Sequence, residues 1–96
     1  MGRAYRWEPT YYYDGGHGWL AVPRAELVRL GLVGQVTAYS YELGETVFLE
    51  EDGDMRLWID AVRADGGGQP DPPEIHDGEY SPIRGYADFH PREEEL

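Results

Sequence analysis

The chain has 96 residues, a length that gives one small domain with a single modest core. It carries no cysteine, which excludes a disulfide framework and a thiolate metal site, and no apolar run approaches the roughly 18 residues of a membrane span. The net charge of −11 is uneven: residues 1–41 hold four arginines against three acidic residues, whereas residues 42–96 hold four against sixteen. Such a field repels nucleic acid and attracts basic surfaces. Without a signal-peptide pattern, we expect a cytoplasmic protein.

The first third of the chain predicts two strands and a helix. Residues 3–8 alternate apolar and polar side chains, which is typical of a half-buried strand. Aspartate and two glycines at 14–16 favour a turn, and residues 19–22 predict a second strand. Residues 23–30 begin with a proline suited to the first helical position, and Gly31 provides a stop. We therefore expect a helix of about two turns.

A hairpin and a longer helix are predicted next. Residues 35–41 are rich in β-forming side chains, residues 42–44 offer a tight connection, and residues 45–50 form the partner strand. Apolar groups on both sides of the partner strand predict a central position in the sheet. Residues 55–64 have the spacing of a helix with one apolar face. That face carries Met55, Trp58, Ile59 and Val62.

A run of carboxylates separates the partner strand from this helix: Glu50, Glu51, Asp52 and Asp54. Carboxylates stabilise a helix N-terminus by roughly 0.3–1 kcal/mol each, because unpaired N–H groups present positive potential there. We expect Asp52 or Asp54 to cap the helix. The run does not fit an EF-hand, since its fifth position counted from Asp52 is Arg56 rather than an oxygen ligand. A looser divalent site on Glu51, Asp52 and Asp54 is left open.

The composition changes at residue 67 to a Pro/Gly-rich acidic segment that contains five of the seven prolines. We expect an α+β domain over residues 1–66 and an acidic tail over residues 67–96, partly packed as an extended strap. The domain is predicted to be a small antiparallel sheet in the order β-β-α-β-β-α, with two short helices on one face.

No pattern indicates catalysis or a resident cofactor. The three histidines, His17, His76 and His90, are scattered and lack metal-binding spacing. The glycines of residues 15–18 lack the third glycine of a dinucleotide loop, and the chain has no lysine for a Walker motif. We expect a protein that is not an enzyme and has no catalytic residues, metal or cofactor.

The acidic side chains are the better candidates for a binding surface. Strand residues two apart are separated by about 6.6 Å, close to the phosphate spacing of one DNA strand, so rigid carboxylates can compete for a basic nucleic-acid channel. The predicted partner-binding residues are Glu42, Glu45, Glu50, Glu51, Asp52, Asp54, Asp60, Tyr39 and Tyr41. The same carboxylates can instead serve only helix capping and solubility. An alternative function is an interaction module that assembles through its tyrosines and second helix, as a homodimer.

Three stretches resemble small proteins of phages and mobile elements: GHGWL at residues 16–20, YSY at 39–41 and VFLEEDGD at 47–54. The resemblance covers roughly residues 15–62 and carries no established activity or site residues. The resemblance implies a class of small acidic phage-type proteins that often inhibit host defence nucleases, as anti-CRISPR proteins do. We therefore expect an anti-CRISPR-like DNA mimic that occupies a basic, nucleic-acid-binding surface of a bacterial defence complex.

Overall fold

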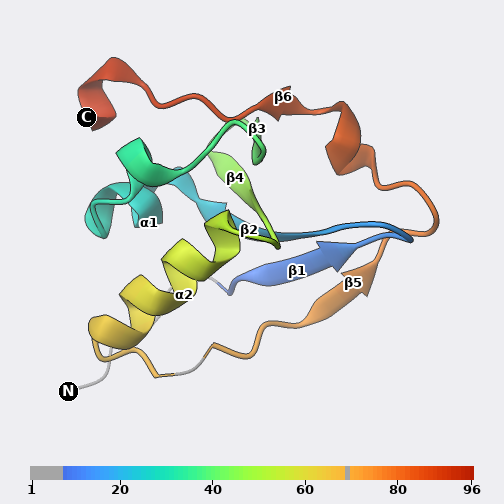
Figure 1. Cartoon of the computed structure of the whole chain (residues 1–96), viewed down its shortest axis with the longest axis horizontal. Helices are drawn as coiled ribbons and strands as arrows, with labels where there is room; N and C mark the ends of the chain where they lie inside the picture. Colours follow the sequence, from blue (N-terminus) through green and yellow to red (C-terminus); the bar gives the residue numbers. More distant parts are fainter. Residues whose placement is uncertain (1–7, 69) are drawn as a thin grey trace.

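The computed structural model describes residues 8–68 and 70–96, which form one six-stranded sheet with helices on one of its faces (Figure 1). The strands are β1 (Thr10–Tyr13), β2 (Gly18–Pro23), β3 (Tyr41–Leu43), β4 (Thr46–Glu50), β5 (Glu74–His76) and β6 (Ala87–Asp88). The α-helices are α1 (Arg24–Arg29) and α2 (Asp54–Ala64), and short 3-10 helices lie at Val33–Gln35, Pro82–Gly85 and Glu93–Glu95. The order from β1 to α2 confirms the predicted α+β class and its β-β-α-β-β-α succession.

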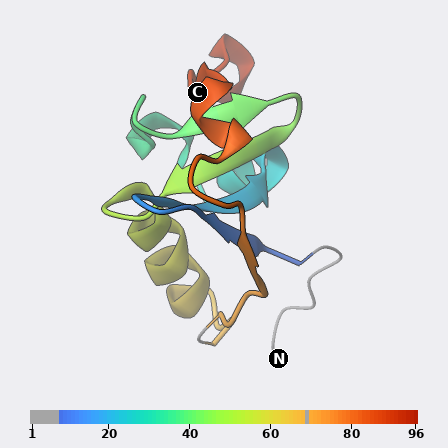
Figure 2. The same ribbon diagram turned by 90° about the vertical axis from the view of Figure 1, so that its right-hand side faces the viewer.

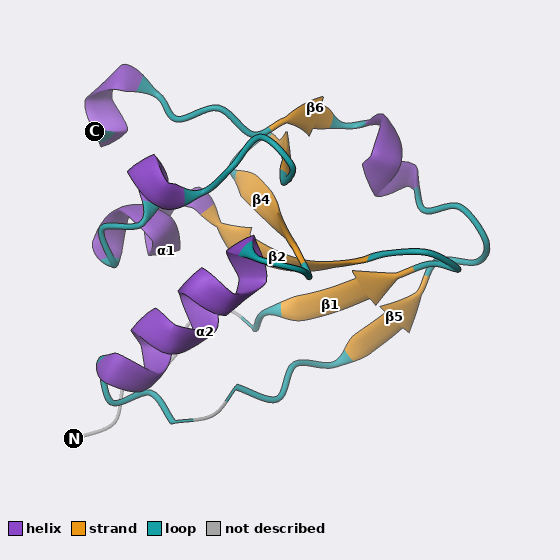
Figure 3. Ribbon diagram, in the orientation of Figure 1, coloured by secondary structure: helices purple, strands orange, loops and turns teal. Residues whose placement is uncertain are grey.

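The strands lie in the order β5-β1-β2-β4-β3-β6. The β1–β5 pair is parallel and the other pairs are antiparallel. Strand β4 lies between β2 and β3, which confirms the interior position expected from its two apolar sides (Figure 3). The sheet therefore joins the N-terminal hairpin to the β3–β4 hairpin through β2 and β4.

The N-terminal hairpin is built from β1, which contains Tyr11, Tyr12 and Tyr13, and β2. Asp14 closes its turn, because the Asp14 Oδ1 atom accepts hydrogen bonds from Gly16 N and His17 N at 2.9 and 3.0 Å. The strand predicted over residues 3–8 lies outside the described residues except for Glu8, which belongs to no strand. The hairpin partner of β2 is instead β1, which lies between the strand predicted over residues 3–8 and the turn predicted at residues 14–16.

The second hairpin is present but shifted along the chain. Residues 35–41 were predicted as its first strand, yet β3 begins only at Tyr41, and the turn falls after it at Gly44, whose φ is 59°. The reason is Asp54, whose Oδ2 accepts hydrogen bonds from Thr37 N, Thr37 Oγ1 and Ser40 Oγ. These bonds fold residues 37–40 into a loop and override their β propensity.

Alternation along β2 and β4 sends apolar side chains to both faces of the sheet. The helix side of the core contains Leu20, Val22, Leu27, Val47, Leu49, Trp58 and Val62. The opposite side contains Trp19, Phe48 and Ile83. Each fully buried large side chain contributes roughly 1.5–3 kcal/mol of hydrophobic stabilisation. The buried Trp58 and Val62 confirm the apolar face predicted for α2.

The C-terminal residues run back over the sheet. Strand β5 pairs with β1 and strand β6 pairs with β3, so the segment reaches both edges of the sheet (Figure 2). Ile83 packs on the face away from the helices, and Phe89 is buried on the helix side. The boundary predicted after residue 66 stays a prediction.

Candidate binding site

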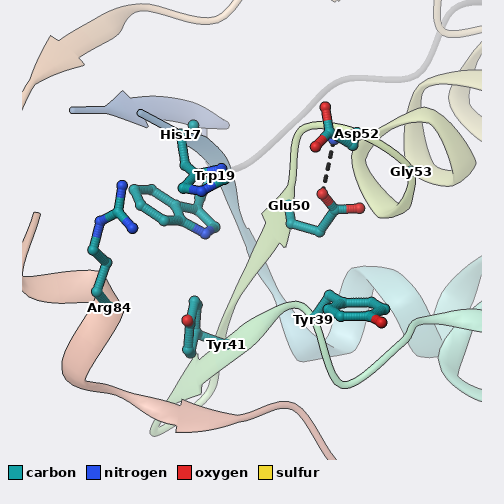
Figure 4. A pocket seen from close by; sticks show the side chains of 9 residues that line it. His17, Trp19, Tyr39, Tyr41, Glu50, Asp52, Gly53 and Arg84 are labelled. Atoms are coloured by element: carbon teal, nitrogen blue, oxygen red, sulfur yellow. Dashed lines mark hydrogen bonds between the residues drawn. The ribbon is translucent and has the colours of Figure 1, made fainter. Parts of the chain in front are cut away.

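A hollow of about 460 Å³ opens on the face of the sheet away from the helices (Figure 4). Strand β2 and the turn before it contribute one side, while the loop leading into β3 and the turn between β4 and α2 contribute the other. Its lining is aromatic and charged: His17, Trp19, Tyr39, Tyr41, Glu50, Asp52 and Arg84, with Gly18 and Gly53. Its volume falls within the roughly 300–1,000 Å³ range of ligand pockets.

The strand register explains why an aromatic floor adjoins a carboxylate. Trp19 of β2 is the cross-strand partner of Glu50 of β4, so both side chains lie on one face of the sheet. Trp19 is only 3% exposed and packs edge-on against Tyr41, with ring centroids 6.2 Å apart. Tyr39 stands at the opposite rim and is 81% exposed. The hollow therefore has a fixed aromatic floor and one open aromatic wall.

Arg84 closes one end of the hollow from the C-terminal segment. Its guanidinium lies 5.5 Å from the centre of the Trp19 ring and bonds the Asp14 carboxylate through Nε–Oδ2 at 2.6 Å and Nη2–Oδ1 at 2.8 Å. These bonds, followed by the backbone N–H groups of Ser81, Gly16 and His17, hold the pKa of Asp14 well below its usual range. The positive charge of Arg84 is thus compensated locally.

Glu50 is the residue that caps α2, and the expectation that Asp52 or Asp54 would do so is wrong. The N-cap position is Gly53, which has no side-chain cap. The Glu50 carboxylate instead accepts hydrogen bonds from Asp52 N at 2.9 Å and from Asp54 N at 3.2 Å. A carboxylate from the preceding strand therefore accepts the first backbone N–H of the helix.

Asp52 and Asp60 point to solvent. Asp52 is exposed at the rim of the hollow, and its carboxylate receives no hydrogen bond from residues 8–68 or 70–96. Asp60 lies on the exposed side of α2, 3.7 Å from Arg56, a distance typical of a weak surface pair.

Glu42 and Glu45 lie away from the hollow and contact the C-terminal segment. Glu42 Oε1 accepts hydrogen bonds from Arg24 Nη1 at 3.0 Å and from His90 N at 2.8 Å. Glu45 pairs with Arg92 at 2.7 and 3.1 Å, and this pair lowers the pKa of Glu45. Both carboxylates therefore fasten the chain to itself, which reduces the charge they offer to a partner.

Glu51 and Asp54 are held by neutral donors. Tyr11 donates its hydroxyl proton to Glu51 at 2.7 Å, and burial together with this bond raises the pKa of Tyr11. Asp54 is 3% exposed and accepts hydrogen bonds from Thr37 and Ser40. Neutral donors do not offset the negative charge of these two carboxylates. Asp54 is nevertheless inaccessible to a partner, because it is buried.

Of the predicted site residues, the structure gathers Tyr39, Tyr41, Glu50 and Asp52 at the hollow. The sequence reasoning missed Trp19 and Arg84. Trp19 would have been found from the β2–β4 register, but no local pattern indicates which strands pair. Arg84 lies in a segment without periodicity, and nothing in the sequence signals its contact with Asp14.

The looser cation site considered for Glu51, Asp52 and Asp54 has no support in the geometry. Within residues 8–68 and 70–96, no group of three metal-ligating side chains is placed to hold an ion. None of the helices described is both long and apolar enough to cross a bilayer.

Comparison of the chain with protein-family models, with curated proteins and with solved structures gave no match.

Proposed function

We propose that the chain is a non-enzymatic acidic binding protein that occupies a basic, nucleic-acid-binding surface of a bacterial defence complex. It acts in the host cytoplasm as an anti-CRISPR-like DNA mimic. The observation that carries the proposal is the hollow itself, where exposed carboxylate and exposed aromatic surface adjoin on a chain of net charge −11. An acidic rim attracts an arginine- or lysine-lined channel, and the aromatic wall adds apolar contact.

The contacts made by each carboxylate support a narrower choice of the groups that face the partner. Glu42 and Glu45 pair with Arg24 and Arg92, and Asp54 is buried. Glu50 ends β4, and Glu51 and Asp52 follow it in the turn before α2. Glu50 and Glu51 accept hydrogen bonds from neutral donors, and Asp52 accepts none from the described residues, so no arginine is paired with these three carboxylates there. The binding surface is therefore this turn with the adjoining hollow, a smaller area than the sequence had indicated.

The interaction module is the second candidate. Tyr39 and Leu43, on the loop and strand of the second hairpin, are 81% and 56% exposed, which favours an apolar contact there. Helix α2 offers less than expected to such a module, because Trp58 and Val62 of its apolar face are buried in the chain's own core. A homodimer formed through the hairpin would be nearly insensitive to salt, and sedimentation would detect it.

Affinity capture from bacterial lysate with charge-matched variants tests the proposal. Glu51→Gln/Asp52→Asn removes two charges at the turn, and the control Glu93→Gln/Glu94→Gln removes two exposed charges near the C-terminus. We expect the wild type and the control to retain nucleic-acid-binding proteins that elute between about 50 and 200 mM salt. The turn variant should lose them. Capture that resists salt, or that both variants weaken equally, would contradict the proposal.

A further inference from the structure

The hollow joins planar apolar surface to negative charge. Trp19 and Tyr41 lie on one side of it, and Tyr39 stands beside Glu50 and Asp52 on the other (Figure 4). Aromatic faces attract cations, and carboxylates accept hydrogen bonds from them. An anion would be repelled here, and a neutral apolar ligand would desolvate the carboxylates without compensation. The lining is therefore complementary to a cation that also has an apolar face.

The chain already binds two of its own guanidinium groups in this way. Arg84 lies 5.5 Å from the centre of the Trp19 ring, and Arg24 lies 5.0 Å from the centre of the Phe89 ring. Each of these arginines also makes two hydrogen bonds to one carboxylate, Asp14 or Glu95. A ring face next to a carboxylate is thus the arrangement that holds a guanidinium in this fold.

Arg84 already covers Trp19 at one end of the hollow, and the opposite rim, with Tyr39, Glu50 and Asp52, offers the same two components. The Asp52 carboxylate is exposed, and no donor in the described part of the chain bonds to it. Each Glu50 oxygen accepts one backbone N–H, and a carboxylate oxygen can accept two hydrogen bonds, so acceptor capacity remains. Tyr39, 81% exposed, presents the open ring.

We infer that the hollow receives the guanidinium of one arginine side chain from the basic partner surface, an inference that rests on the function proposed above. The planar guanidinium stacks on the open Tyr39 ring and donates to Asp52 and Glu50. Lysine binds less well, since its ammonium is a compact, strongly hydrated charge without a planar face. The arginine is the anchor of the interface, and the surrounding carboxylates steer its approach.

Titration of the ¹⁵N-labelled full chain with small probes tests the inference directly. The probes are N-acetyl-arginine amide, N-acetyl-lysine amide and N-acetyl-citrulline amide, the last having nearly the arginine shape without its charge. We expect arginine to shift the Trp19 indole and the Tyr39 and Asp52 amides to saturation, with lysine weaker and citrulline without effect. Equal shifts from citrulline, or arginine shifts spread along the acidic C-terminal segment, would overturn the inference.

Matched variants locate the contacts. Tyr39→Leu and Asp52→Asn should each weaken the arginine probe about three-fold, whereas Tyr39→Phe should bind like the wild type. Asp60→Asn removes the same charge from exposed α2 surface and should leave binding unchanged. Because these side chains are exposed, the amide spectra should stay those of the folded chain. Equal weakening by Asp52→Asn and Asp60→Asn would show a diffuse charge effect and refute the anchor.

The probe titration and the lysate capture fail independently. If the arginine probe binds in the hollow but no salt-labile nucleic-acid-binding protein is captured, the anchor stands and the proposed function is wrong. If capture is salt-labile but the probe does not bind and Tyr39→Leu has no effect on capture, the function stands and the arginine anchor is wrong.

Discussion

The Arg24 guanidinium and the Glu95 carboxylate, 71 positions apart in the chain, form two hydrogen bonds: Nε donates to Oε2 at 2.9 Å and Nη2 to Oε1 at 2.6 Å. The same guanidinium donates to Glu42 and to the His90 carbonyl, and it is 2% exposed. Its carbon lies over the Phe89 ring. One buried arginine at the start of α1 therefore fastens the C-terminal segment to the sheet.

Replacing this arginine should loosen the C-terminal segment. Arg24→Leu leaves Glu42 and Glu95 without their cation, and breaking a buried pair costs roughly 3–5 kcal/mol; we expect the lower end because Glu42 is partly exposed. Urea unfolding measures the loss, and hydrogen exchange should show that the Phe89 amide, which donates to Ser40 O, loses protection. The control is Arg92→Leu, whose exposed pair with Glu45 should contribute much less to stability. Equal losses of unfolding free energy in the two variants would contradict the role of Arg24 in fastening the C-terminal segment.

The same pair predicts an acid-sensitive stability. Hydrogen bonds from Arg24 lower the pKa of Glu95 to about 2, below the value of about 4.3 expected in the unfolded chain. A lowered folded-state pKa stabilises the fold above the unfolded value, and this contribution disappears as the pH falls from about 5 to 2. The free energy of unfolding of the wild type should therefore exceed that of Glu95→Gln at pH 6 and converge with it near pH 2. A difference that stays constant over this range would contradict the prediction.

Substitution of Asp54 should lower the stability of the fold, whereas substitution of Asp52 should leave it almost unchanged, although the sequence assigned both to the binding surface. Asp54→Ala removes the acceptor of three hydrogen bonds from Thr37 and Ser40, so we expect a loss of roughly 1.5–3 kcal/mol. Asp52→Ala removes an exposed carboxylate and should change stability by less than about 0.5 kcal/mol. Thermal unfolding of both variants provides the comparison, and a stable Asp54→Ala protein would refute the structural role.

Gly18 should not tolerate a side chain. A Cβ at this position would overlap the Tyr11 ring, whose hydroxyl donates to Glu51. Gly18→Ala should therefore cost roughly 1–3 kcal/mol through overpacking, measured by urea unfolding. A Cβ at Gly85 meets no atom, so Gly85→Ala serves as the neutral control. Adding Tyr11→Ala should make the double variant less unstable than the sum of the two changes; strict additivity would show that the overlap is not the cause.

Short-range sequence patterns predicted the two α-helices, whose faces and ends depend on neighbouring residues. The spacing of apolar residues in α2 and the glycines with positive φ after α1 and α2, Gly31 and Gly66, gave these helices their faces and ends. The start of β3 could not be predicted, because Asp54 reaches back 14 residues to Ser40 and removes the preceding loop from the sheet. Its buried acceptor role overrides the strand propensity of residues 35–40.

The site was predictable only in part for the same reason. Tyr39, Tyr41, Glu50 and Asp52 come from the two sides of a hairpin, so sequence proximity brings them together. Trp19 lies beside them because of the β2–β4 register. Glu42 and Glu45 were predicted to bind a partner, but they pair instead with arginines that are distant in the sequence. Neither kind of contact has a local sequence signal.

Competition between this protein and duplex DNA for a captured partner tests the central claim most directly. Binding of the partner to the labelled protein is measured by anisotropy at increasing concentrations of duplex DNA and at two salt concentrations. The account predicts mutually exclusive binding: the apparent Kd rises in proportion to the free DNA concentration, and affinity falls steeply with salt. A ternary complex with DNA, or an affinity that neither DNA nor salt changes, would contradict it.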